Sequence, residues 1–118
     1  MTSLVACLSS GKGTWAHVTE LIKKQEWDSI FLITDDFGVK NFSSDKEVNF
    51  VVIDSNKFLS DIAKDIKLQL EGKIKDFEVA VNLISGSGKE HMAVISALTK
   101  LGLGIRLIAL TPEGVKEI

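Results

Sequence analysis

Five short apolar runs along the chain alternate with segments of helical or polar pattern. A short apolar run between turn residues is typical of a strand that is buried on both faces. Strands of this kind that alternate with helices pair in parallel, with helices on both faces of the sheet. The pattern therefore predicts an α/β fold: a Rossmann-like three-layer sandwich with a mostly parallel, five-stranded sheet. The expected strands cover residues 3–8, 28–34, 48–53, 77–84 and 105–110.

Three segments carry apolar residues at helical spacing. The first begins at Thr14 and the third covers Glu90 to about Leu101. The second is the clearest, and Gly72 follows its last turn as a helix-ending glycine does. The third is apolar over most of its surface, so we expect it to lie deep in the fold or at an interface. The apolar face of the second helix is formed by Phe58, Leu59, Ile62, Ala63, Ile66 and Leu70.

The segment between the second and third strands does not fit this alternation. Residues 39–46 are polar and turn-forming, and they lack a convincing helical period. They are interpreted as a loop. A short helix, or a reversal that makes one strand antiparallel, remains an alternative.

Length and charge narrow the class of protein. The 118 residues fit a single domain, 1–118, and the formal net charge is −2. No overall basic field recruits nucleic acid, so we expect no duplex DNA binding, and any polyanion must bind at a local site.

The only cysteine, Cys7, lies in an apolar run, which favours a buried thiol, and a single cysteine excludes a disulfide within the chain. Without a leader-like or membrane-length apolar segment, we expect a cytoplasmic protein with no membrane partner.

Two strand-to-helix loops have the composition of an anion site. They are 9–14 (SSGKGT) and 85–89 (SGSGK), and each combines glycines, hydroxyls and one lysine. Glycine lets backbone N–H groups approach an anion, the helix N-terminus adds a favourable dipole, and lysine adds a full charge. The candidate ligand-binding residues are Ser9, Ser10, Gly11, Lys12, Gly13, Ser85, Gly86, Gly88, Lys89 and His91.

The same two loops predict the strand order. In the order 3-2-1-4-5 the first and fourth strands are neighbours, and their loops face one another where ligands bind in such sheets. In the order 2-1-3-4-5 the partner would be residues 54–56 (Asp-Ser-Asn), which are poorly suited to an anion. The loop chemistry therefore favours 3-2-1-4-5.

Known phosphate motifs match only in part. The P-loop pattern fails at both loops, because Ala6 and Leu83 stand where its first glycine is required. Residues 11–16 satisfy G-x-G-x-x-A, and Asp35 or Asp36 follows at the distance of a ribose-binding acid. A dinucleotide-binding domain is therefore one alternative.

Several of these residues also have a purely structural interpretation. Ser87 and Glu90 form the capping-box pattern S-x-x-E, which starts a helix without any ligand. Lys12 and Lys89 can be solvated loop lysines, and His17 is more often a surface or packing residue than a catalytic one. No Cys/His cluster suggests a metal, and we expect no cofactor. A structural domain whose loops are only tight turns is a further alternative.

The loop after the fourth strand also resembles that of the CARF domains, the CRISPR-associated Rossmann-like sensors of cyclic oligoadenylates. Their pattern there is an acidic or amide residue, a Thr-Gly-Gly-Thr-Lys-like turn and a methionine-containing helix. The corresponding residues here are Asn82, Ser85, Gly86, Lys89 and Met92. The chain has Gly-Ser-Gly where the family has Gly-Gly-Thr, and its spacing from Asn82 to Lys89 is one residue longer.

The resemblance implies a homodimer that binds a cyclic oligoadenylate on its two-fold axis, with both loops touching phosphate and ribose. Some CARF relatives cleave the ring without metal, by attack of a ribose 2′-hydroxyl on the adjacent phosphate. In such a ring nuclease Lys89 would stabilise the developing charge and Ser10 would orient the phosphate. Sensor and ring nuclease are therefore two separate expectations from the same resemblance.

Overall fold

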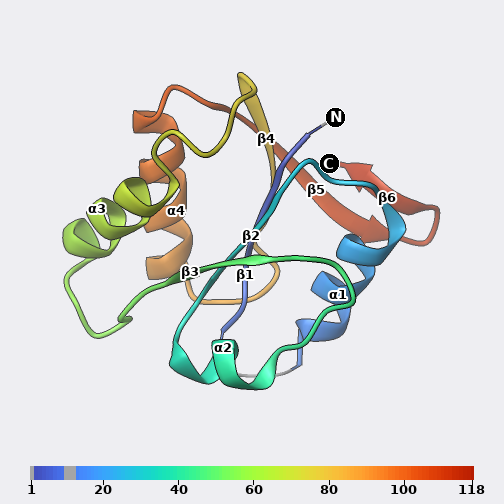
Figure 1. The fold of residues 1–118 in the computed structure, drawn as a ribbon, viewed down its shortest axis with the longest axis horizontal. Helices are drawn as coiled ribbons and strands as arrows, with labels where there is room; N and C mark the ends of the chain where they lie inside the picture. The colour runs from blue at the N-terminus through green and yellow to red at the C-terminus, as the bar shows by residue number, and fades with distance from the viewer. Residues whose placement is uncertain (1, 10–12) are drawn as a thin grey trace.

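The computed structural model describes residues 2–9 and 13–118, and strands and helices alternate along most of this length (Figure 1). The strands are β1 (Leu4–Cys7), β2 (Ile30–Thr34), β3 (Asn49–Val52), β4 (Glu78–Asn82), β5 (Gly104–Thr111) and β6 (Gly114–Glu117). The helices are α1 (Trp15–Lys24), α2 (Asp36–Asn41), α3 (Leu59–Leu70) and α4 (Gly88–Lys100).

The strands form one mostly parallel sheet in the order β3-β2-β1-β4-β5-β6. The first five pair in parallel, and only β6 runs antiparallel to its neighbour, β5. The α/β class and the order 3-2-1-4-5 predicted from the loop chemistry are confirmed. The prediction of five strands is wrong, because the sheet of the described residues has a sixth. The arrangement is consistent with the expected Rossmann-like sandwich.

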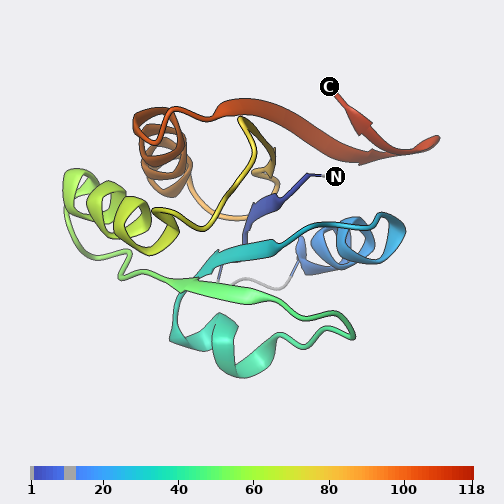
Figure 2. The same ribbon diagram turned by 45° about the horizontal axis from the view of Figure 1, so that its top comes forward.

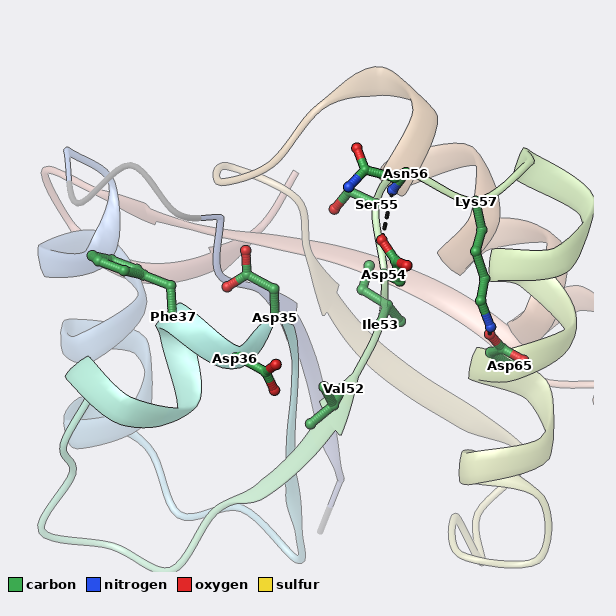
Figure 3. Close-up of a pocket in the computed structure, with 10 residues that line it drawn as sticks. All are labelled: Asp35, Asp36, Phe37, Val52, Ile53, Asp54, Ser55, Asn56, Lys57 and Asp65. Atoms are coloured by element: carbon green, nitrogen blue, oxygen red, sulfur yellow. Dashed lines mark hydrogen bonds and ion pairs between the residues drawn. The ribbon is translucent and has the colours of Figure 1, made fainter.

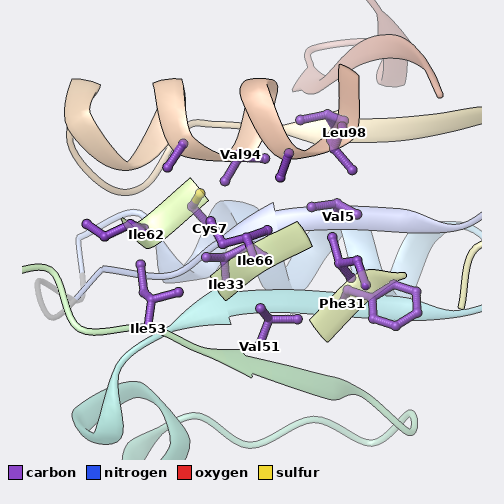
Figure 4. Packing of buried hydrophobic residues seen from close by; sticks show 14 of the residues in the cluster. Val5, Cys7, Phe31, Ile33, Val51, Ile53, Ile62, Ile66, Val94 and Leu98 are labelled. Atoms are coloured by element: carbon purple, nitrogen blue, oxygen red, sulfur yellow. The ribbon is translucent and has the colours of Figure 1, made fainter. Parts of the chain in front are cut away.

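Helices cover both faces of the sheet (Figure 2). One apolar cluster joins α3 and α4 to residues such as Val5 and Phe31 (Figure 4), and a second joins α1 to residues such as Leu4 and Leu32. Both faces of β1 and β2 are therefore buried, which explains why these strands are continuous apolar runs rather than alternating ones.

The segment after β2 contains the short helix α2, and β3 is parallel to β2. Asp35 precedes the helix, and its Oδ1 accepts a hydrogen bond from the backbone N–H of Gly38 at 3.0 Å. The alternative of a short helix is therefore confirmed for residues 39–41, which belong to α2, while the loop holds only for 42–46 and the reversal to an antiparallel strand is wrong. A six-residue helix is too short for its period to stand out in the sequence.

The sixth strand forms a hairpin with β5. The Thr111 hydroxyl donates to the carbonyl of Gly114 at 2.8 Å and accepts from the N–H of Glu113 at 3.2 Å. Gly114 has a φ of +107°, which glycine adopts at little cost. In the sequence, Thr-Pro-Glu-Gly marks the end of a strand equally well, and β6 carries too few apolar residues to be recognised.

Of the helices in the described residues, none combines the length and the apolar character needed to cross a membrane. The third predicted helix, α4, lies partly deep and partly exposed. Its residues Ala93, Val94, Ala97 and Leu98 are buried, while Met92 and Ile95 are exposed.

Candidate functional site

The loops after β1 and β4 meet at the carboxyl edge of the sheet, as predicted. The backbone N–H of Ser9 donates to the Ser85 hydroxyl at 2.8 Å, and that hydroxyl donates to the Ser9 hydroxyl at 3.1 Å. Ser85 is 1% exposed. Its hydroxyl therefore joins two loops that lie 76 residues apart in the sequence.

The first loop is described only at its two ends. Ser10, Gly11 and Lys12, all predicted ligand-binding residues, lie outside the described residues. Gly13 is exposed, and a Cβ added to it would meet no atom within 4 Å. The described part of this loop therefore contributes the Ser9 backbone and hydroxyl to the junction.

The second loop leads into α4 through a complete capping box. The Ser87 hydroxyl accepts from the N–H of Glu90 at 3.4 Å, and the Ser87 N–H donates to the Glu90 carboxylate at 2.7 Å. Gly88 is the first residue of α4. The structural interpretation of Ser87 and Glu90 is confirmed, since both start the helix.

Gly86 adopts a conformation that L side chains rarely accept. Its φ is +98°, and a Cβ there would lie 3.0 Å from the Glu90 carboxylate and 3.2 Å from His91 Nε2. His91 Nε2 lies 2.8 Å from the carbonyl oxygen of Ser85, and because a carbonyl oxygen only accepts, this nitrogen donates the hydrogen bond. The glycine thus folds the loop back over the first turn of α4, and His91 fixes it there.

Lys89 reaches toward a third loop. Its Nζ donates to the carbonyl oxygen of Ser55 at 2.9 Å, and the Ser55 hydroxyl donates to the Glu90 carboxylate at 2.9 Å. The composition of residues 54–56, Asp-Ser-Asn, predicts a poor partner for an anion. These residues nevertheless join the site, because α3 and α4 pack on the same face of the sheet and bring their N-termini together.

An open cavity of 590 Å³ lies beside these loops, beyond the ends of β2 and β3 (Figure 3). Four aspartates line it together with Lys57, whose Nζ is 3.1 Å from Asp65 Oδ2. No group of three or more His, Cys, Asp and Glu side chains within residues 2–9 and 13–118 is arranged to hold a metal ion. The cavity offers hydrogen-bond acceptors to hydroxyl or amino groups. The four aspartates are Asp35, Asp36, Asp54 and Asp65.

The side chains of Asn82 and His17 hydrogen-bond to backbone groups near the end of β5, beside this edge. The Asn82 side chain, 3% exposed, donates to the carbonyl of Ile108 at 2.9 Å and lies 3.3 Å from His17 Nε2. The same His17 nitrogen accepts from the N–H of Leu110 at 3.2 Å. Both side chains thereby supply partners to the part of β5 that overhangs the end of β4. The packing interpretation of His17 agrees with this position, and its role as a strand partner was not visible in the sequence.

Cys7 lies beneath the second loop, 2% exposed. Burial, and secondarily the negative charge of Glu90, raises the pKa of its thiol from 9.0 to about 12. The predicted buried thiol is confirmed, and such a thiol is a poor nucleophile at neutral pH.

This shift predicts a loss of stability in base. Above pH 9 the unfolded chain releases the Cys7 proton while the folded chain keeps it until about pH 12, so stability falls as pH rises through this window. We expect the thiol to remove about 2 kcal/mol from the free energy of unfolding between pH 8 and pH 10.5. Urea denaturation of wild type and Cys7→Ala at both pH values measures it. Equal pH dependence of the two proteins would contradict the prediction.

In comparisons with models of protein families, with curated proteins and with solved structures, the chain matches none.

Proposed function

We propose that this chain is a CARF-like nucleotide-binding domain that takes a cyclic oligoadenylate, or a similar phosphate-rich nucleotide, at the junction of the β1–α1 and β4–α4 loops. The observation that carries the proposal is the pair of hydrogen bonds between Ser9 and Ser85. These bonds bring together the two loops with anion-binding composition. The junction also lies between β1 and β4, where α1 and α4 leave toward opposite faces of the sheet.

In this proposal the phosphates lie over the loops and the nucleosides extend toward the acidic cavity. The N-terminus of α4 and the Lys89 ammonium favour negative charge at the junction. Lys89 is exposed, and among the described residues its ammonium donates only to the Ser55 carbonyl oxygen, so it can turn to a phosphate without leaving a buried charge behind. The aspartates of the cavity would repel phosphate, but they can accept hydrogen bonds from ribose hydroxyl and adenine amino groups.

A homodimer with the ligand on its two-fold axis belongs to the same proposal.

A dinucleotide-binding domain is the second candidate, and one observation favours it. Asp35, at the end of β2, lines the cavity beside the junction, where a ribose-binding acid is expected. Its second carboxylate oxygen is not needed for the cap of α2.

Calorimetric titration of the full chain with cyclic tetra-adenylate, cyclic hexa-adenylate and NAD tests both candidates. We expect one of the cyclic ligands to bind with micromolar or lower Kd, and Lys89→Ala to weaken binding about tenfold through loss of one charge contact. Lys73→Ala, at an exposed lysine beyond α3, is the matched control and should bind as wild type does.

Failure of both cyclic ligands to bind at high micromolar concentration would overturn the first candidate, and binding of NAD alone would support the second. Incubation with a labelled cyclic ligand in chelator separates the sensor from the metal-independent ring nuclease. Products that form with wild type but not with Lys89→Ala would assign cleavage to this chain. A ring that stays intact with wild type would assign sensing.

A further inference from the structure

A groove of 470 Å³ runs between α3 and α4 on the surface of the layer that faces away from the sheet. Its walls come from matching stripes at a spacing of four residues, Leu59 and Ala63 on α3 and Met92 and Ser96 on α4. Both helices connect parallel strands on one face of the sheet, so they run in the same direction. Each stripe ends in a lysine, Lys67 on α3 and Lys100 on α4, and Ser60 and Lys64 complete the lining.

The groove is therefore graded along its length. Toward the helix N-termini it is apolar, and Met92 is 62% exposed there although methionine gains free energy from burial. All its charged lining residues are lysines: Lys64 lies at the middle of α3, and Lys67 and Lys100 lie toward the helix C-termini.

These cations are only weakly neutralised. Lys67 lies 3.6 Å from a carboxylate oxygen of Glu71, one turn further on, where both side chains are partly exposed. Lys64 and Lys100 make no ion pair within the described part of the chain. In a chain with a formal net charge of −2, this groove is locally basic. Its charge is therefore complementary to an acidic partner.

We propose that the α3–α4 groove docks a short, amphipathic helical segment of a partner protein, with apolar side chains in one half and acidic side chains in the other. The apolar half would pack on Met92, Leu59 and Ala63, and the acidic half would face the three lysines. The lining from Leu59 to Lys67 covers nine residues of helix, a rise of about 12 Å, which matches roughly two turns of a docked helix. This site is separate from the loop junction, and it stands whether or not the chain binds a nucleotide.

Two synthetic helical peptides of about twelve residues test the proposal. Both carry leucines on one face of their first half; the second half carries glutamates in one peptide and lysines in the other. We expect the acidic peptide to bind the full chain at least tenfold more tightly than the basic one, by fluorescence anisotropy. In amide NMR spectra the shifts should be confined to exposed residues of α3 and α4.

Charge reversal sharpens this experiment. Lys64→Glu with Lys100→Glu should weaken the acidic peptide at least tenfold and strengthen the basic one. Lys23→Glu with Lys40→Glu changes the net charge equally, at exposed positions of α1 and α2, and should leave the preference unchanged. Met92→Ala should weaken both peptides severalfold, because the apolar contact is common to them.

Equal binding of the two peptides to wild type, or equal losses in the two double variants, would overturn the proposal. A dimer of the chain alone, seen by sedimentation and lost in Met92→Ala, would also overturn it, since the groove would then hold a second copy.

Discussion

Replacing Gly38 by alanine is expected to lower the free energy of unfolding by about 3 kcal/mol and the melting temperature by roughly 10 °C. Gly38 is buried in α2, and a Cβ there would overlap the hydroxyl oxygen of Thr34 and lie 2.9 Å from Thr34 Cβ. Rotation of the Thr34 side chain would move the hydroxyl but not Cβ. The backbone of α2 must therefore shift away from β2.

Helix propensity alone predicts the opposite result, that Gly38→Ala raises the free energy of unfolding. Alanine is favoured over glycine inside a helix by about 1 kcal/mol, so only the close approach to Thr34 makes the change unfavourable. Gly88→Ala is the matched control, because a Cβ at this first residue of α4 meets no atom within 4 Å. Urea denaturation should show Gly88→Ala within about 1 kcal/mol of wild type, on the stabilising side. Similar losses in the two variants would show that α2 does not press on β2 as described.

The Thr34 side chain also provides a suppressor. Its hydroxyl is buried without a hydrogen-bond partner, so Thr34→Ala removes two of the three close atoms and breaks no hydrogen bond of the described residues. We expect Thr34→Ala to restore part of the stability lost in Gly38→Ala. A double variant no more stable than the single one would place the strain elsewhere.

Replacing Asn82 by leucine is the change with the second largest expected effect, a loss of about 3 kcal/mol. The side chain of Asn82 donates to the Ile108 carbonyl, and its oxygen accepts from the N–H of Ile84 at 3.3 Å. Leucine has similar volume but no polar atom, so the Ile108 carbonyl loses its partner in a buried place and the Ile84 N–H loses its partner in a partly buried one. Each such group costs about 1–3 kcal/mol, and the apolar gain of leucine offsets only part of this.

Asn49→Leu is the matched control for this substitution. Asn49 also donates to a strand carbonyl, that of Ile30 at 3.1 Å, but it is an exposed residue at the outer strand of the sheet. Water can replace the lost bond there, and we expect a loss below about 1 kcal/mol. Denaturation of both variants measures the difference, and faster amide exchange of Leu110 in Asn82→Leu would localise the damage to the β5 overhang. Equal losses in the two variants would contradict the role given to Asn82.

The functional tests depend on different residues from these stability tests. Lys89, Lys64 and Lys100, the lysines changed in these tests, are exposed, so their variants should fold as wild type does. Loss of binding in those variants would therefore report on the contact itself. The stability of the Gly38 and Asn82 variants instead tests the packing and hydrogen bonds that form the carboxyl edge of the sheet.

The sequence by itself determined the α/β architecture of this protein. Continuous apolar runs such as 3–8 and 28–34 require burial on both faces, and this leaves a parallel sheet between helices as the solution. The chemistry of two local loops was enough to favour the observed strand order. The Ser87–Glu90 capping box was equally readable, because both partners lie within one turn of the same helix. Each of these features depends on neighbours in the sequence or on a repeated period.

Only the tertiary structure decided the features that join distant segments. The contact of Ser55 with Lys89 and Glu90, the shared nitrogen of His17 and the close approach of Gly38 to Thr34 leave no periodic trace in the chain. The groove between α3 and α4 likewise exists only because two helices, about thirty residues apart in the sequence, pack side by side on the sheet. Local propensity acts over a few residues, whereas these contacts depend on how the helices pack on the sheet. The same packing places the acidic cavity beside the loop junction.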